Sequence, residues 1–177
     1  MLTALLQYLR NFIIYTITTV CLVYSRAQQP RIQCDFFMSL TCDKCHKFLC
    51  NIMPQIERTY PIQFITHLMF FDHASFFAAR LLSNCTNEHT KRTILQILFQ
   101  NLSDKKPHII KAEAVANIRR TYRLTLSPPA YILEMKKHYQ QRGIVQTPTF
   151  HINGHTFLNA EDLCRYLQKY FYSPHTV

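Results

Sequence analysis

The amino-acid sequence predicts an α/β domain whose central mixed sheet is flanked by helices and interrupted by an inserted helical segment. The first observation behind this prediction is an alternating, strand-like run at residues 32–39, which leads into two closely spaced cysteines and a helical pattern. The second is a near-continuous apolar run at residues 61–71, typical of a strand covered on both faces. The third is a pattern of strand, tight turn, strand and helix at residues 149–171, which follows helical sequence over residues 72–143.

The composition is that of one folded domain. The chain has 177 residues, of which 48% are hydrophobic, so it can bury a core and is not a disordered chain. Its net charge of +10 is compatible with nucleic acid, an acidic membrane surface or an acidic partner. However, no run of Lys or Arg is longer than two residues, and no platform of interleaved aromatic and basic residues occurs. We therefore expect no nucleic-acid partner.

The N-terminal residues 1–27 have the pattern of an export segment. Arg10 supplies a positive charge, residues 12–24 form a 13-residue run without charge, and Ser25 and Ala27 offer the small side chains that a signal peptidase reads. A membrane span needs about 20 apolar residues, so this run is short for one. We expect a cleaved signal peptide, with an uncleaved N-terminal membrane anchor or a buried helix as alternatives. An exported chain would work in the periplasm or cell envelope.

The elements beside the cysteines follow one another closely. After the first strand, apolar residues recur at helical spacing, namely Phe48, Leu49, Ile52, Met53, Ile56 and Tyr60. Pro54 should kink or end this helix, because proline lacks the N–H group that an inner helical turn requires. The run at residues 61–71 then forms a second strand, central in the sheet and parallel to the first.

The rest of the chain divides into an insertion and a closing unit. The insertion contains helical patterns at residues 73–85, 88–101, 112–122 and 128–143, and Pro107 interrupts the sequence before the third. Two short strands at residues 149–152 and 155–158 are joined by an Asn153–Gly154 turn, and residues 161–171 form a closing amphipathic helix. The chain thus divides into an export segment (residues 1–27), a first sheet part with the cysteines (28–71), a helical insertion (72–143) and a second sheet part (144–177).

Cys42 and Cys45 are the candidate reactive groups. They stand at the start of a helix, where free N–H groups and the helix dipole stabilise an anion, so Cys42 should ionise easily. Cys45 lies one turn further and can close or resolve a disulfide with it. Lys44, and His46 when it is protonated, should lower the pKa of Cys42, whereas Asp43 should raise it.

Two segments resemble a known family. Residues 31–46 are similar to the active site of the thioredoxin superfamily, and of its DsbA-like branch in particular. Residues 145–154 resemble the cis-proline loop, strand and hairpin of the same family, in which the X-Pro bond, here Thr147–Pro148, faces the cysteine pair. The resemblance covers roughly residues 28–71 and 143–172 and implies a thioredoxin fold. DsbA-like proteins also carry a helical insertion between these two parts.

The resemblance also implies roles for several residues. Pro148 would keep a substrate strand next to the thiols and deny Cys42 a metal, and Thr147 would influence substrate release and oxidising strength. Family members often keep a buried carboxylate six residues before the first cysteine as a proton relay. Asp35 lies seven residues before Cys42, so either the loop carries an extra residue or Asp35 lacks this role.

These features predict an exported DsbA-like thiol–disulfide oxidoreductase. It would introduce or exchange disulfides in cysteine-containing polypeptides through a mixed disulfide at Cys42, which Cys45 resolves. No cofactor and no metal are expected, and the resemblance implies a membrane redox partner. A disulfide reductase or isomerase of the same fold is the nearest alternative.

Alternatives of a different class also fit parts of the sequence. Cys42 to His46 match the Cys-x-x-Cys-His signal for c-type haem attachment, with His46 as axial ligand. A metal-binding or partner-binding module is a further alternative, and Cys34, Cys50 and His67 are the side chains that could complete a zinc site. The sequence does not decide how Cys34, Cys50, Cys85 and Cys164 pair.

Overall fold

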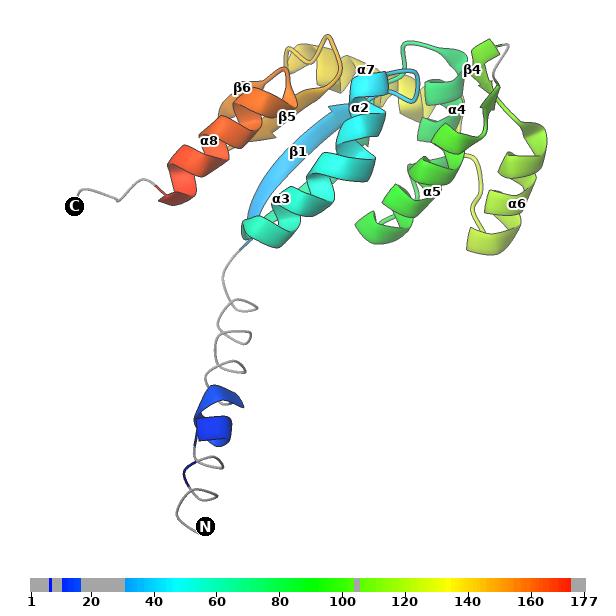
Figure 1. Ribbon diagram of the computed structural model, residues 1–177. Coiled ribbons are helices and arrows are strands. Elements are labelled where there is room, and N and C mark those ends of the chain that lie inside the picture. The colour runs from blue at the N-terminus through cyan, green and yellow to red at the C-terminus, as the bar shows by residue number, and fades with distance from the viewer. Residues whose placement is uncertain (1–6, 8–10, 17–30, 104–105, 173–177) are drawn as a thin grey trace. The chain divides into compact units, whose positions relative to one another are not determined.

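The computed structural model describes residues 7, 11–16, 31–103 and 106–172 (Figure 1). The chain consists of two compact units, residues 1–32 and 33–177. In the first unit, residues 11–16 are helical, and the Thr16 hydroxyl donates to the carbonyl oxygen of Phe12 at 2.8 Å. The predicted export segment lies largely outside the described residues. Within the part of the chain that is described, no helix is long and apolar enough to cross a membrane.

The second unit is built on a four-stranded sheet with the order β2-β1-β5-β6. Its strands are β1 (Ile32–Met38), β2 (Ile62–Leu68), β5 (Thr149–Ile152) and β6 (His155–Phe157). The pairs β1–β5 and β5–β6 are antiparallel, whereas β1 and β2 run side by side in the same direction, and the Met69 N–H donates to the Met38 carbonyl oxygen at 2.7 Å. The predicted mixed sheet is therefore confirmed.

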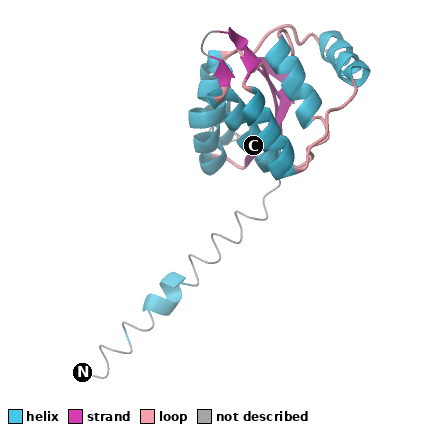
Figure 2. Ribbon diagram, turned by 90° about the vertical axis from the view of Figure 1, so that its right-hand side faces the viewer, coloured by secondary structure: helices cyan, strands magenta, loops and turns pink. Residues whose placement is uncertain are grey.

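Helices cover both faces of this sheet (Figure 2). On one face lie α2 (Asp43–Lys47), a π-helical turn η1 (Phe48–Ile52), α3 (Met53–Thr59) and α8 (Ala160–Tyr172). Phe48 of η1 packs on Phe36 and Phe150, with ring centroids 4.8 and 4.6 Å apart. On the other face, Tyr139 of α7 (Pro129–Gln141) packs on Phe37 at 5.4 Å. Alternate residues of β1 thus enter two different cores.

The helix after the cysteines does not end at Pro54. The sequence indicated either a kink or an end at this proline, and the second of these expectations was wrong. The chain is helical from residue 43 to residue 59, and the π-helical turn η1 directly precedes α3. In this wider turn the Met53 N–H donates to the Phe48 carbonyl oxygen, five residues back. A π turn changes the backbone register just where the proline ring would clash with an α-helical carbonyl group. Pro54 consequently stands in the first turn of α3, where its missing N–H group is tolerated.

The insertion contains the predicted helices and one hairpin that was not predicted. The helices are α4 (His73–Leu82), α5 (Glu88–Gln100) and α6 (Ala112–Tyr122), with α7 closing the segment. Asn87 caps α5, because its side-chain oxygen accepts the Thr90 N–H at 2.9 Å. Between α5 and α6, β3 (Leu102–Ser103) and β4 (Lys106–Ile110) pair antiparallel. Pro107, which in the sequence indicated only a break before the third helix, is the second residue of β4.

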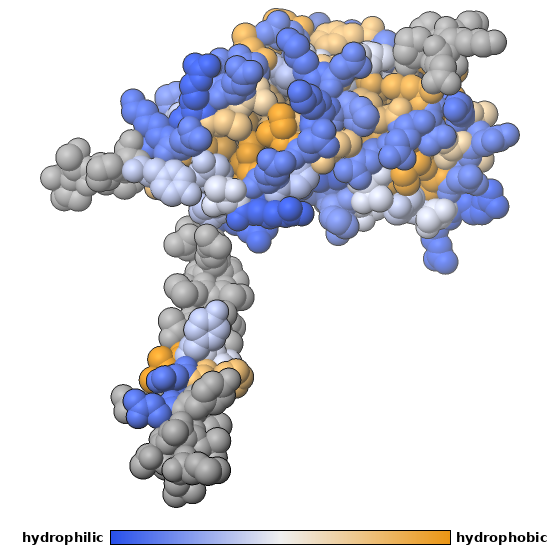
Figure 3. Space-filling view, in the orientation of Figure 1, coloured by the Kyte–Doolittle hydropathy of each residue, from blue (hydrophilic) through white to orange (hydrophobic). Residues whose placement is uncertain are grey.

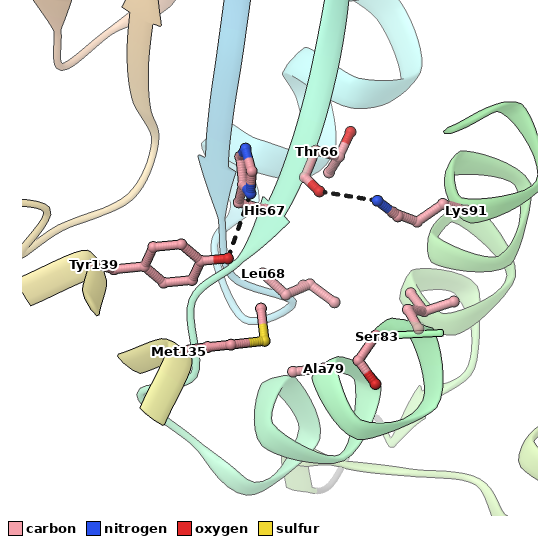
Figure 4. Close-up of a pocket in the computed structure, with 9 residues that line it drawn as sticks. Thr66, His67, Leu68, Ala79, Ser83, Lys91, Met135 and Tyr139 are labelled. Carbon is pink, nitrogen blue, oxygen red and sulfur yellow. Dashed lines mark hydrogen bonds between the residues drawn. The ribbon is translucent and has the colours of Figure 1, made fainter. Parts of the chain in front are cut away.

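Strand β2 lies at the edge of the described sheet, so the expectation of a central strand was wrong. Ion-paired side chains occupy its free edge. The Phe64 N–H donates to Glu57 at 3.3 Å, and Arg92 donates to the Phe64 carbonyl oxygen at 2.6 Å. Two residues further on, the Thr66 N–H donates to Glu88 at 3.0 Å and Lys91 donates to the Thr66 carbonyl oxygen at 3.4 Å (Figure 4). These side chains satisfy an edge that a neighbouring strand would otherwise cover.

Candidate active site

The cysteine pair stands where β1 turns into the helix. Cys42 is the N-cap of α2 and keeps an extended backbone (φ −98°, ψ 104°), while its carbonyl oxygen accepts the His46 N–H at 3.0 Å. The Cys42 Sγ atom accepts the backbone N–H of Cys45 at 3.2 Å. Cys42 is partly exposed, whereas Cys45 is fully buried. One sulfur can therefore meet a reactant from solvent, and the other stands behind it.

The surroundings of the two thiols move their pKa values in opposite directions. The hydrogen bond from the Cys45 thiol is the main cause that lowers the pKa of Cys42 to about 6, and burial opposes it. Backbone N–H groups of Cys45 and Lys44 and the Thr147 side chain lower it further. Burial, together with the hydrogen bond to Cys42, raises the pKa of Cys45. Cys42 is thus the thiolate near neutral pH and Cys45 the thiol.

The Thr147–Pro148 segment reaches the cysteines across the sheet. Its peptide bond is cis, as the family resemblance implied. Strand β5 starts immediately afterwards, and Thr149 pairs with Phe37 of β1, close to the end of the strand that leads to the cysteines. The Thr147 side chain is accordingly a hydrogen-bonding partner of both thiols. Pairing of β5 with β1 brings these residues together over a sequence separation of about a hundred residues.

The residues between and after the cysteines point into solvent. Asp43, Lys44 and His46 are all exposed, and the His46 ring stacks on Phe99 of α5 with centroids 4.5 Å apart. Lys44 contributes to the low pKa of Cys42 through its backbone N–H group. Hydrogen bonds close to the sulfur, rather than the side-chain charges expected from the sequence, therefore account for the shift.

Asp35 is not brought to the cysteine pair. Its carboxylate contacts His67 Nε2 at 3.0 Å and Arg142 at 3.8 Å, and the Tyr139 hydroxyl lies 3.4 Å from His67 Nδ1 (Figure 4). The alternation of β1 places Asp35 on the face covered by α7, opposite the helix that carries the cysteines. Phe36, six residues before Cys42, occupies the family's carboxylate position and packs on aromatic rings instead.

Sequence reasoning missed a polar network beside the pair. The turn at residues 39–41 is bonded to the N-terminus of α4, where Asp72 is the N-cap and its side chain accepts the Ser75 N–H at 2.8 Å. Asp72 also accepts the Thr41 hydroxyl at 2.8 Å, and the Ser39 and Ser75 hydroxyls lie 3.0 Å apart. An Asp three residues before a Ser at the start of a helix is a recognisable cap. The sequence contains no signal, however, that this cap meets the cysteine turn.

The described residues form no group of three or more His, Cys, Asp or Glu side chains that could hold a metal ion. Cys34, Cys50 and His67, which could have completed a zinc site, are therefore not assembled with the cysteine pair. All six described cysteines are free thiols, namely Cys34, Cys42, Cys45, Cys50, Cys85 and Cys164. Burial raises the pKa of Cys34, Cys50 and Cys164, so these thiols are less reactive than Cys42.

Comparisons with known proteins agree with this architecture. A family model described as thioredoxin matches residues 32–169. No curated protein sequence matches the chain. Among solved structures, alpha-DsbA1 of Wolbachia pipientis is similar with a TM-score of 0.63 and 17% identity, over 80% of this chain and 86% of that one. Oxidised BdbD from Bacillus subtilis is similar with a TM-score of 0.60 and 17% identity, over 80% and 88%.

A third similar structure is a periplasmic thioredoxin-like protein from Salmonella enterica serovar Typhimurium. It has a TM-score of 0.58 and 15% identity, over 81% of this chain and 85% of that one. At such identities the likeness concerns the fold. Together with the family model it confirms the predicted sheet with an inserted helical segment and the resemblance to the thioredoxin superfamily.

Proposed function

Because the chain belongs to the thioredoxin family, we propose that it is a DsbA-like thiol–disulfide oxidoreductase acting on cysteine-containing polypeptides. The observation that carries this proposal is the asymmetric pair: a partly exposed Cys42 with a pKa of about 6 in front of a buried Cys45 whose pKa is raised. A low-pKa thiol is both a ready nucleophile at neutral pH and a good leaving group, and thiol–disulfide exchange needs both properties at the same sulfur.

In the oxidising direction the cycle begins with a disulfide between Cys42 and Cys45. A substrate thiolate attacks Cys42 Sγ, the bond to Cys45 breaks, and Cys45 leaves as a thiolate that takes up a proton because its pKa is high. A second substrate thiolate then attacks the substrate sulfur of the mixed disulfide, and Cys42 leaves as a stable thiolate. The substrate loses two electrons to form its disulfide, and the protein gains them as two reduced cysteines.

The acidity of Cys42 favours this direction over reduction. With a pKa of about 6 the Cys42 sulfur is about nine-tenths thiolate at pH 7, whereas an ordinary cysteine is only a few per cent thiolate. Interactions that stabilise this thiolate exist only in the reduced protein, so they pull the protein toward reduction and its substrate toward oxidation. We therefore infer an oxidase, which a membrane redox partner would reoxidise.

Polypeptide substrates would bind beside the Thr147–Pro148 segment. Exposed apolar side chains lie just before it in the sequence and in the segment between β2 and α4: Val145 is 70% exposed and Phe71 is 53% exposed. Both line a pocket of about 70 Å³. More generally, the face of the molecule drawn in Figure 3 shows apolar patches between hydrophilic side chains. Such surface suits an extended, unfolded chain whose apolar residues are still accessible.

We further propose that the protein works in the periplasm or cell envelope. The export pattern of residues 1–27 supports this, either as a cleaved signal peptide or as an N-terminal anchor. A structurally similar protein is described as periplasmic. An oxidising compartment is also where newly made disulfides persist.

The test is oxidation of a reduced, unfolded model protein by the purified, preoxidised chain. Wild type should restore the disulfides stoichiometrically, Cys42→Ser should not, and Cys164→Ser, which alters a thiol outside the site, should act like wild type. The oxidase proposal is rejected if Cys42→Ser retains activity. A midpoint potential well below that of glutathione would reverse the proposed direction to that of a reductase, and a haem absorption band would move the protein to another class.

A further inference from the structure

The turn that precedes Cys42 is bonded to the first helix of the insertion at several points. The Ser75 hydroxyl accepts the Leu40 N–H at 3.0 Å and donates to Asp72 Oδ2 at 2.8 Å. Asp72 Oδ2 also accepts the Thr41 hydroxyl at 2.8 Å and the Ser39 hydroxyl at 3.3 Å. A single carboxylate at the N-terminus of α4 therefore accepts hydrogen bonds from hydroxyl groups of both the turn and its own helix.

The centre of this network is buried, whereas Thr41 is exposed and Asp72 is partly exposed. Ser75 is fully buried and Ser39 is 2% exposed, so a hydrogen bond lost at either serine leaves a polar group without water as a substitute. The Leu40 N–H is an example, because its acceptor is the Ser75 hydroxyl. The turn is consequently held by Ser75 as well as by hydrogen bonds among its own residues.

The turn at residues 39–41 also determines where the Cys42 sulfur lies. The Cys42 N–H donates to the Ser39 carbonyl oxygen at 3.3 Å, and the Thr41 N–H donates to the Ser39 hydroxyl at 3.3 Å. These contacts set the extended backbone of Cys42 at the N-cap, from which its Sγ atom receives the Cys45 N–H. A shift of the turn would lengthen that hydrogen bond, which is charge-assisted and sensitive to geometry.

We propose that Asp72 and Ser75 are positioning residues for the redox pair: the N-terminus of α4 holds the turn at residues 39–41 and thereby keeps Cys42 in hydrogen-bonding position. The inference rests on the proposed function, in which the Cys42 thiolate is the reactive group. It gives the helical insertion a part in the chemistry, since an element outside the sheet controls the acidity of the attacking sulfur.

Ser75→Ala is the most informative variant. It removes the hydroxyl but keeps the Asp72 charge and the cap of Asp72 on the N–H group of residue 75. An Asp72 variant would confound the result, because removal of a negative charge by itself favours a nearby thiolate. The measurement is the rate of Cys42 alkylation by iodoacetamide across pH in the full reduced chain, followed by peptide mass spectrometry. We expect the midpoint to rise by roughly one pH unit, which is about a tenfold lower thiolate-to-thiol ratio.

Ser83→Ala is the matched control on the same helix. The Ser83 hydroxyl bonds Ser127 and the Arg80 carbonyl oxygen at the far end of α4, away from the turn. This variant should lower the melting temperature to a similar extent and leave the alkylation midpoint of Cys42 unchanged. Thr41→Val, at an exposed position, removes one bond to Asp72 and should shift the midpoint in the same direction by a smaller amount, whether or not Ser75→Ala folds.

The positioning role is refuted if Ser75→Ala and Thr41→Val titrate like wild type, or if Ser83→Ala shifts the midpoint equally. The potential of the Cys42–Cys45 couple against glutathione is the second readout, and it should become less oxidising in the two turn variants alone. Alkylation needs no substrate. A wild-type chain that titrates near pH 6 but oxidises no polypeptide would therefore contradict the proposed function and leave the positioning role intact.

Discussion

The hydrogen bond from the Cys45 thiol to the Cys42 sulfur can be tested by a pair of substitutions at position 45. Cys45→Ala removes the donor, while Cys45→Ser replaces it with a hydroxyl of similar reach. Both variants lack the resolving sulfur, so both lose turnover. They differ only in whether a side-chain hydrogen bond still reaches Cys42. That difference separates the acidity of Cys42 from the chemistry of disulfide formation.

The expected size follows from the local structure. A hydrogen bond to a charged group contributes about 1.5–3 kcal/mol. Because Cys42 is partly exposed, water replaces part of a lost bond, and the low end of this range applies. One pKa unit corresponds to about 1.4 kcal/mol, so Cys45→Ala should raise the pKa of Cys42 from about 6 to about 7. At pH 6 the thiolate fraction then falls from about one half to about one tenth.

The assay is the pH dependence of Cys42 alkylation, or of thiolate absorbance near 240 nm, in reduced protein. Cys45→Ala should titrate about one pH unit above Cys45→Ser, which should stay close to wild type. The remaining backbone N–H bonds should keep both midpoints below that of an ordinary cysteine, about 8.5. Equal midpoints for the two variants would refute the role assigned to the Cys45 thiol and leave the backbone groups as the cause.

Three further outcomes are expected. In the reduced protein the pKa of Cys42 is about 6 in the folded state and about 8.5 in the unfolded state. The Cys42 thiolate therefore contributes its full stability above pH 8.5, and this contribution is lost as the pH falls through 6. Urea unfolding should show that the free energy of unfolding drops more between pH 8 and pH 6 in wild type than in Cys42→Ala. Asp35→Asn should lower the free energy of unfolding by about 1 kcal/mol, because it weakens the pairing with His67, and should leave the alkylation midpoint of Cys42 unchanged. A shifted midpoint would show that the Asp35 carboxylate acts on the redox pair. Arg92→Met should lower the free energy of unfolding in urea by about 1–3 kcal/mol, because it removes the ion pair of Glu57 and the side-chain donor to the Phe64 carbonyl oxygen of β2. An unchanged free energy would show that this edge needs no cover.

Much of the fold was predictable because its signals are local. The alternation at residues 32–39, the helical spacing after the cysteines and the Asn153–Gly154 turn each act on neighbouring residues, and these elements formed where the patterns indicated. The β3–β4 hairpin was missed because Pro107 usually interrupts a strand. Its strand pairs on one side only within the described sheet, where a missing N–H group is tolerated. The edge position of β2 was missed because its apolar run is equally compatible with a central strand.

By itself, the sequence determined which atoms can react and how they begin to be activated. Two cysteines one helical turn apart at an N-terminus acquire the Cys45 N–H as a hydrogen-bond donor through local geometry, whatever surrounds them. Only the tertiary structure decided which distant groups join them. Thr147 reaches the cysteines through strand pairing, and Asp72 reaches the turn before Cys42 through the packing of α4. The reason is physical: a hydrogen bond forms only within about 3 Å, and sequence patterns carry periodicity but no distance between elements far apart in the chain.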